Sequence, residues 1–186
     1  MRLLFTIDAQ DYPPDAPRFV RPSVRGIILR GDKIALVHSL EYDFYKFPGG
    51  GIEPGEDHLQ TLLREVAEES GLIVRPESVR EYGWVRRVER GHAKGVEDVF
   101  EQDNYYYLCD TEDAPGAQAL TASEQRLRLA LEFADPRTAV AANRAALHNP
   151  RVKRDEAGHP NMLEREARVL ELLVAEGYFE KEVQPC

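Results

Sequence analysis

Apolar and polar residues alternate along this chain with two different periods, which predict short strands in some segments and helices in others. Apolar runs of strand length stand at Arg2 to Ile7, Val24 to Leu29, Lys33 to His38, Val79 to Val88, Phe100 to Cys109 and Leu127 to Phe133. Arg30-Gly31-Asp32 separates the second run from the third and is a hairpin signal, so we expect these two strands to pair antiparallel. Four prolines between Asp11 and Pro22 predict an irregular connector there.

One segment carries helix signals at both of its ends. Asp57 can act as the N-cap, Gln60 can be its capping-box partner, and Gly71 can supply the left-handed residue that ends a helix. Four apolar residues at helical spacing predict one buried stripe: Leu59, Leu62, Leu63 and Val66. We therefore expect an amphipathic helix between Asp57 and Gly71.

Two more helices are expected in the last third of the chain. Pro136 to Leu147 follows Asp135 as a cap, and Met162 to Glu176 ends at Gly177. The polar, proline-containing segment from Asn149 to Asn161 between them predicts a linker. Strands interspersed with few helices indicate an α/β fold with a mixed sheet and helices packed on its faces.

The helix between Asp57 and Gly71 carries an unusual row of acids. Glu65, Glu68 and Glu69 recur at i, i+3 and i+4, and like charges at this spacing repel by roughly 0.2–0.5 kcal/mol per pair. Arg64 cannot neutralise all three carboxylates. One interpretation is a solvated acidic face. The other is a site for a hard divalent cation such as Mg²⁺, which prefers oxygen ligands.

The spacing of the whole stretch is more specific than its charges. From Gly50 the chain reads GGIEPGEDHLQTLLREVAEESGL, with Glu56 after five residues, Arg64-Glu65 after seven more, then Glu68-Glu69 and Gly71. This stretch resembles the Nudix box at every fixed position. Because few short motifs fix so many residue types at set spacings, the resemblance favours the metal site over the solvated face.

The resemblance implies a Nudix-type α/β/α sandwich with a mixed sheet, here with a C-terminal helix in addition. It implies a pyrophosphohydrolase that cleaves a phosphoanhydride in a nucleoside diphosphate linked to another group: a nucleotide sugar, a dinucleotide or a (damaged) nucleoside triphosphate. It implies Mg²⁺ or Mn²⁺ as the cofactor, which would neutralise phosphoryl charge and acidify the attacking water.

Roles for individual residues follow from the same resemblance. The implied metal ligands are Glu65, Glu68, Glu69 and the carbonyl of Gly50 or its neighbour Gly49. Arg64 would orient a glutamate, while Glu56 and Gly71 would shape the motif. The general base lies either in the box or in a later loop of the family, and Glu124 is our candidate outside the box.

Two other segments have both a functional and a structural interpretation. The stretch from Arg86 to Gly95 is locally basic, so that Arg86, Arg87 and Arg90 are either substrate-binding residues or part of a solvated hairpin loop. Strand alternation would place Arg87 on the face opposite the other two. Phe47, at the end of an aromatic run before the box, is either a substrate contact or sheet packing.

Composition and net charge exclude some classes of binding partner. The chain has 186 residues, and we expect a hydrolase domain over residues 1–150, with residues 151–186 as a linker and a helix that packs on it or extends it. A net charge of −9 disfavours long nucleic acid and leaves a small-molecule nucleotide as the partner. Two cysteines and no long apolar run indicate a cytoplasmic protein without a membrane span. A homodimer is compatible with the sequence.

Two alternatives to a hydrolase remain open. A non-catalytic nucleotide-binding module on the same fold usually lacks a metal glutamate, whereas this chain keeps all three. An enzyme similar to the isopentenyl diphosphate isomerases would use a cysteine near the site, and the candidates are Cys109 and the terminal Cys186. A phosphate-release assay separates these alternatives from a hydrolase.

Overall fold

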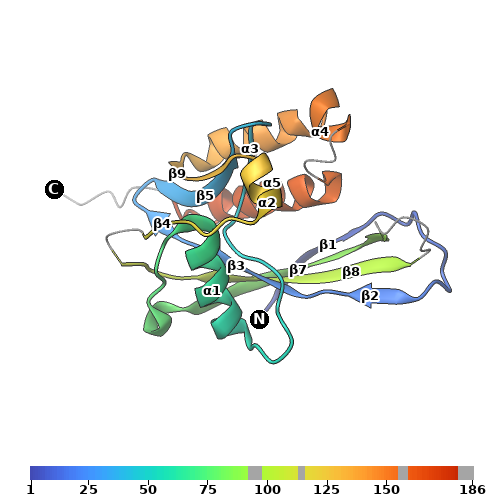
Figure 1. Cartoon of the computed structure of the whole chain (residues 1–186), viewed down its shortest axis with the longest axis horizontal. Helices are drawn as coiled ribbons and strands as arrows, with labels where there is room; N and C mark the ends of the chain where they lie inside the picture. The colour runs from blue at the N-terminus through green and yellow to red at the C-terminus, as the bar shows by residue number, and fades with distance from the viewer. Residues whose placement is uncertain (92–97, 113–115, 155–158, 180–186) are drawn as a thin grey trace.

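The computed structural model describes residues 1–91, 98–112, 116–154 and 159–179 (Figure 1). The strands are β1 (Leu3–Asp8), β2 (Arg18–Val20), β3 (Ser23–Ile27), β4 (Leu29–Arg30), β5 (Lys33–Ser39), β6 (Phe44–Lys46), β7 (Arg80–Arg90), β8 (Val99–Leu108) and β9 (Leu129–Ala134). The helices are α1 (His58–Ser70), the 3₁₀ turn η1 (Pro76–Ser78), α2 (Ala122–Arg126), α3 (Pro136–Ala146), α4 (Pro150–Arg154) and α5 (Pro160–Ala175).

The strands form two sheets that lie between two groups of helices. In the first sheet β7 and β8 pair antiparallel, β1 runs parallel to β7, and β2 and β3 both run parallel to β8. In the second sheet β5 pairs antiparallel with β4, β6 and β9. Figure 1 shows α1 on one side of the strands and α3 and α5 on the other. The expected α/β sandwich with a mixed sheet and a C-terminal helix is confirmed.

The hairpin predicted on either side of Arg30-Gly31-Asp32 forms only in part. Residues Ser23–Ile27 leave it and pair parallel with β8, while Leu29–Arg30 pair with Ile34 and Lys33. The chain changes sheets at Ile28, whose carbonyl still accepts a hydrogen bond from the N–H of Ala35 at 2.9 Å. One apolar run therefore supplies strands to both sheets, because its residues are buried from either side.

Other element boundaries differ from expectation. The proline-rich connector contains β2, and the predicted linker from Asn149 to Asn161 contains α4 and the first two residues of α5. The basic segment that starts at Arg86 is strand as far as Arg90 rather than loop. The remainder of that segment includes residues 92–97, which lie outside the described ranges.

Helix α1 has the predicted caps. The Asp57 carboxylate accepts from the Gln60 N–H at 2.8 Å, the Gln60 side chain accepts from the Asp57 N–H at 2.9 Å, and Gly71 has φ of 74°. The predicted buried stripe was wrong at Leu59, which is 39% exposed. The helix is rotated so that its buried face runs through Leu62 and Val66 to Glu69, which brings a carboxylate into the interior.

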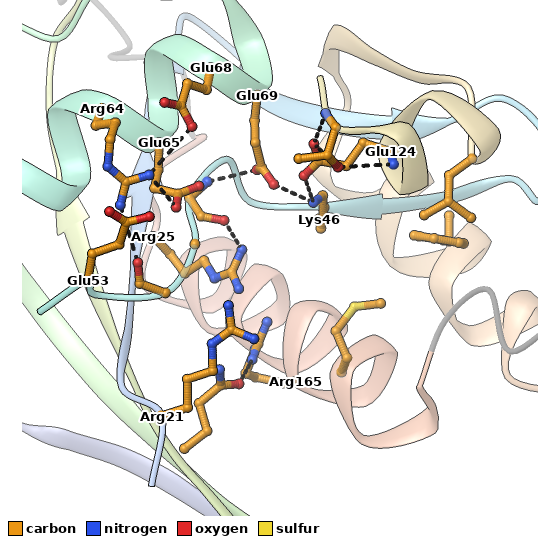
Figure 2. A pocket seen from close by; sticks show the side chains of 18 residues that line it. Arg21, Arg25, Lys46, Glu53, Arg64, Glu65, Glu68, Glu69, Glu124 and Arg165 are labelled. Atoms are coloured by element: carbon orange, nitrogen blue, oxygen red, sulfur yellow. Dashed lines mark hydrogen bonds and ion pairs between the residues drawn. The ribbon is translucent and has the colours of Figure 1, made fainter. Parts of the chain in front are cut away.

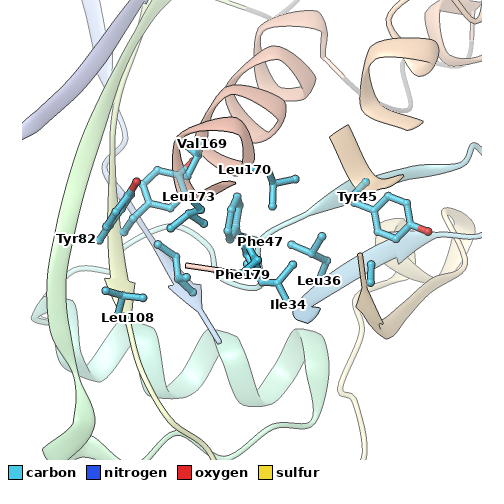
Figure 3. Close-up of a cluster of buried hydrophobic side chains, with 14 of the residues drawn as sticks. Ile34, Leu36, Tyr45, Phe47, Tyr82, Leu108, Val169, Leu170, Leu173 and Phe179 are labelled. Carbon is cyan, nitrogen blue, oxygen red and sulfur yellow. The ribbon is translucent and has the colours of Figure 1, made fainter. Parts of the chain in front are cut away.

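The largest hydrophobic cluster joins the C-terminal helix to the sheets (Figure 3). Val169, Leu170 and Leu173 of α5 pack in the same cluster as Ile34 of β5 and as Phe47, which follows β6. A second cluster, around Leu62 and Val66, fixes α1 on the other side of the strands. In the described ranges, no helix is both long and apolar enough to pass through a membrane.

Two polar side chains of the C-terminal helices hold the segment that leads into the predicted box. Asn143 of α3 accepts from the N–H of Tyr45 at 2.7 Å and donates to its carbonyl at 2.9 Å. Glu166 of α5 accepts from the N–H of Phe47 at 3.0 Å. Both side chains are fully buried, so they satisfy backbone groups of β6 and its exit that have no water to bind.

Candidate active site

A cavity of about 460 Å³ opens between α1, the residues that lead into it, α2 and the N-terminal end of α5 (Figure 2). Acidic side chains form one wall: Glu53, Glu65, Glu68, Glu69 and Glu124. Basic side chains also line it: Arg21, Arg25, Lys46, Arg64 and Arg165. The sequence thus brings together the box glutamates and the candidate base, Glu124, in one cavity.

Glu69 is the most deeply placed of these acids, at 4% exposure. Its Oε1 lies 2.5 Å from Nζ of Lys46, and its Oε2 accepts from the N–H of Gly49 at 2.9 Å. Burial raises the pKa of the Glu69 carboxyl, and the charges of Lys46 and Arg25 oppose that rise. Glu69 therefore links α1 to β6 and to the glycine turn.

Glu65 lies directly over the glycine turn. A Cβ atom placed on Gly50 would come within 2.3–2.5 Å of the Glu65 carboxyl group, so only glycine leaves that carboxylate its place. Glu65 also accepts from Arg64 at 2.7 Å, and Glu68 lies 3.4 Å from the same nitrogen. Glu68 is the most exposed of the three, with 46% of its side chain accessible.

Arg64 connects these acids to the loop before α1. Its Nε and Nη2 donate to the two carboxylate oxygens of Glu56 at 2.7 and 2.8 Å, which is a bidentate pair. The hydroxyl of Thr61 donates to Glu56 at 2.7 Å. Hydrogen bonds from Arg64 and Thr61 lower the pKa of Glu56 to about 2. Arg64 thus joins Glu56 of the loop to Glu65 and Glu68 of α1.

Glu124 enters the cavity from α2 rather than from a loop. Its carboxylate accepts from the N–H and the hydroxyl of Thr121, both at 2.8 Å, and its Oε1 lies 4.0 Å from Nζ of Lys46. Burial acts to raise its pKa, but the two Thr121 hydrogen bonds and the charge of Lys46 outweigh burial and lower it. Glu124 is therefore ionised at neutral pH.

The three arginines proposed from the basic segment do not line this cavity. Arg86 forms ion pairs with Glu101 and Asp103 across the first sheet, and Arg90 donates to the carbonyl of Asp11 at 3.0 Å. Arg87 faces the opposite side of β7, as strand alternation predicts, and is buried. Its guanidinium pairs with Glu89 at 2.9 Å and lies over the ring of Phe100.

Phe47 is a core residue and not a substrate contact. Its ring is fully buried and meets the ring of Tyr106 edge-on, with the centroids 5.3 Å apart. An aromatic run before a glycine turn is more often sheet packing than a ligand contact. The pairing of β6 with β5 and the cover of α5 decide for packing, because together they enclose the ring.

Several lining residues were not singled out from the sequence. Lys46 belongs to the aromatic run, and the positive charge inside that run was its only signal. Arg165 and Glu166 interrupt the amphipathic pattern of α5 on its buried side, which is a signal for a buried ion pair. Arg21 precedes β3 and Arg25 lies within it, beside a sheet junction that local patterning does not predict.

The oxygen atoms that line the acidic wall are the type of ligand that a hard divalent cation prefers. The acidic wall offers carboxylate oxygens and glycine carbonyls, and no lining residue is a histidine or cysteine. In the described ranges no three acidic, histidine or cysteine side chains converge as closely as metal ligands do. Instead Lys46 forms an ion pair with Glu69, and Arg64 forms one with Glu65. The carboxylates that would bind a metal ion are therefore present and are paired with basic side chains.

Comparison with known proteins identifies the family. The NUDIX domain family matches residues 20–154, which is well over half of the chain. The chain belongs to the Nudix family. It is therefore a Nudix hydrolase that acts on pyrophosphate bonds, and the Nudix box predicted from Gly50 to Leu72 lies inside the matched region.

Solved structures of Nudix proteins are similar at low identity. A MutT protein from work on Aliivibrio salmonicida and Vibrio cholerae is 17% identical and covers 85% of this chain and 99% of its own, with a TM-score of 0.49. The Escherichia coli ORF135 protein is 19% identical, with coverages of 89% and 95% and a TM-score of 0.48. The family assignment rests on the matched domain and not on these likenesses.

The isomerase-like alternative needs a cysteine at the site. Cys109 lies in the second hydrophobic cluster beside Val24, away from the cavity, and burial raises its pKa to about 12. A thiol in this environment is protonated and inert. The other cysteine, Cys186, lies outside the described ranges.

Proposed function

We propose that this Nudix hydrolase cleaves the phosphoanhydride of a nucleoside diphosphate linked to another group, and that it requires Mg²⁺ or Mn²⁺. The observation that supports this proposal is the wall of carboxylates on α1 and α2 that faces basic side chains across one cavity (Figure 2). Carboxylates suit divalent cations, and guanidinium and ammonium groups suit phosphoryl oxygens. A diphosphate bridged to a cation satisfies both walls at once.

The cation would be held by Glu65, Glu68 and Glu69, with the carbonyl of Gly50 or Gly49 as an additional ligand. When bound, it supplies positive charge against the phosphoryl oxygens and acidifies the attacking water. Arg64 would orient Glu65 and Glu68, as its 2.7 and 3.4 Å contacts with them suggest.

The chain's own residues supply proton transfer and orientation. Glu124 is an ionised carboxylate beside Lys46, so it would accept the proton of the attacking water. Lys46 lies between Glu69 and Glu124 and would turn towards a phosphoryl oxygen when substrate enters. The buried Glu166 and Asn143 would act as positioning residues, because they fix the backbone of Tyr45 and Phe47 on either side of Lys46.

The extent of the domain and its partners are part of the same proposal. We infer that residues 1–150 form the hydrolase domain and that the following segment extends it, which the shared core of α5 and the sheets supports. A net charge of −9 favours a small nucleotide over long nucleic acid as the substrate.

A phosphate-release screen tests the proposal. Purified protein is stripped with EDTA and then assayed with Mg²⁺ or Mn²⁺ on nucleotide sugars, dinucleoside polyphosphates and nucleoside triphosphates. We expect at least one class to be hydrolysed, and turnover to vanish with EDTA and return with metal. Hydrolysis that persists unchanged in EDTA would refute the metal requirement. Failure of every substrate with both metals would refute the substrate class.

A further inference from the structure

Three arginines from two distant parts of the chain meet on the side of the cavity away from the box helix. Arg21 precedes β3, Arg25 lies within β3, and Arg165 comes from α5. Figure 2 shows their guanidinium groups turned towards one another, opposite Glu65 and Glu69. Arg165 lies beyond residues 20–154, the part of the chain that matches the family domain.

A carboxylate partner is present for only one of these three charges among the described residues. Arg165 pairs with Glu166 and donates to Asn104 and, at 3.2 Å, to Gln102. Among the residues that the structure describes, Arg25 donates only to the backbone carbonyls of Phe47 and Gly49, and its buried Nε has no partner. Within the described ranges the side chain of Arg21 makes no hydrogen bond or ion pair and is exposed at the mouth of the cavity.

The positive charges of Arg165 and Arg25 also act on a neighbouring buried group. The pKa of Arg87, buried behind the cavity, is lowered to about 10 by its burial and by the charges of Arg165 and Arg25. Converging guanidinium groups repel when they are partly shielded from water, and an anion removes that repulsion. Guanidinium forks match phosphoryl oxygens in geometry as well as in charge.

The cavity offers little for recognition of a base. Among its described lining residues Phe44 is the only aromatic one, and it is 1% exposed. No aromatic face is therefore open for a base to stack on, although stacking is a common and sequence-tolerant way to hold bases. Charge is the property that the cavity presents most strongly to a substrate.

We propose that Arg21, Arg25 and Arg165 form an arginine subsite that binds a phosphoryl group of the substrate other than the one under attack. Such a subsite selects substrates by the number of their phosphoryl groups and not by the identity of the base. Arg21 closes over the bound group and Arg25 contacts it from the floor. Arg165 is 1% exposed and paired with Glu166, so it adds its charge and the support of α5 beneath that floor. This inference rests on the proposed function, which places the attacked phosphoryl group at the acidic wall.

Binding of inorganic triphosphate to metal-free protein in EDTA tests the subsite without any turnover. Calorimetry compares wild type with Arg21→Gln, which removes an exposed, unpartnered charge and therefore leaves the fold intact. Arg80→Gln is the matched control, because Arg80 is exposed and lies outside the cavity. Loss of one charge-assisted contact predicts about tenfold weaker binding in Arg21→Gln and no change in Arg80→Gln.

A second measurement does not depend on removal of a buried arginine. The kcat/KM of the wild-type enzyme is measured, with the metal that gives the highest activity, on four nucleoside triphosphates that differ only in the base. It is also measured on the corresponding nucleoside diphosphate. We expect the four bases to agree in kcat/KM within about threefold, and the diphosphate to be lower by about tenfold or more, because it lacks the group that the subsite holds. Arg21→Gln should reduce that preference by raising KM for the triphosphate.

Three results would overturn the arginine subsite: triphosphate that does not bind, equal binding by Arg21→Gln and wild type, or strong base preference with no phosphate-number preference. These results are distinguishable from failure of the proposed function. Binding in EDTA is independent of metal and chemistry, so the subsite can fail while turnover still requires the box glutamates. Conversely, arginine-dependent binding without metal-dependent hydrolysis would refute the proposed function alone.

Discussion

The ammonium nitrogen of Lys46 lies 2.5 Å from Oε1 of Glu69 and connects the last residue of β6 to the buried face of α1. The side chains are 16% and 5% exposed, so water does little to screen the pair. Lys46 also lies 4.0 Å from Glu124 on α2. The ammonium group of Lys46 therefore connects α1 and α2, the helices that carry the acidic wall. Its positive charge offsets part of the negative charge that a divalent ion would otherwise neutralise.

Removal of Lys46 should destabilise the protein through Glu69. In Lys46→Met the Glu69 carboxylate is left buried without its partner, which predicts a loss of about 3 kcal/mol in the free energy of unfolding. Glu69→Gln in that background should restore part of the loss, with a coupling of roughly 1–3 kcal/mol in a double-mutant cycle. Denaturant unfolding of wild type, the two single variants and the double variant, all without metal, measures this coupling energy. Additive effects would show that the pair is not coupled.

Gly50→Ala should affect activity far more than stability. The new Cβ would collide with the Glu65 carboxyl group, which is the end of a flexible side chain and can move away at little cost. Displacing a carboxylate of the acidic wall by about 1 Å predicts a loss of roughly 100-fold in kcat. The control is Gly116→Ala, whose Cβ would be 3.5 Å from its nearest neighbour. Full activity in Gly50→Ala would contradict the placement of Glu65.

The contribution of Glu56 to stability should depend on pH in one direction. Its pKa is lowered from 4.5 to about 2 in the folded protein, so folding favours the ionised form. The stabilisation is complete above pH 4.5 and is lost as the pH falls towards 2. The free energy of unfolding of Glu56→Gln should therefore be lower than that of wild type by the largest amount at pH 7. The difference between the two proteins should be smaller at pH 3.5. A gap that widens on acidification would have the wrong sign.

Local signals predicted the box helix because they act over a few residues. Asp57, Gln60 and Gly71 cap it as expected, and the grouping of the glutamates on one side follows from helical spacing alone. Leu59 shows the limit of periodicity. The stripe was predicted correctly at Leu62 and Val66 but not at Leu59, and the buried face continues at Glu69, which pairs with Lys46.

The basic side of the cavity could not be predicted from local patterns. Arg165 reaches Gln102 and Asn104, which are 63 and 61 residues away in sequence, and Arg25 enters because the apolar run from Val24 to Leu29 divides between two sheets. The predicted substrate role of Arg86 rested on local sequence alone, and the three-dimensional pairing of the strands does not place it in the cavity. It belongs to a locally basic segment, yet strand pairing places it against Glu101 on the other sheet surface.

The most direct test of the central claim is the turnover of Glu68→Gln with Mg²⁺ or Mn²⁺. Glu68 is the box glutamate with the least structural role, since 46% of its side chain is exposed and its contact with Arg64 is 3.4 Å long. Glu77→Gln, at an exposed acid outside the cavity, is the control. If the acidic wall holds the cation, Glu68→Gln keeps the melting temperature of wild type and loses about 100-fold or more in kcat, while Glu77→Gln stays fully active. Equal turnover in Glu68→Gln and wild type, with the same metal dependence, would contradict the account.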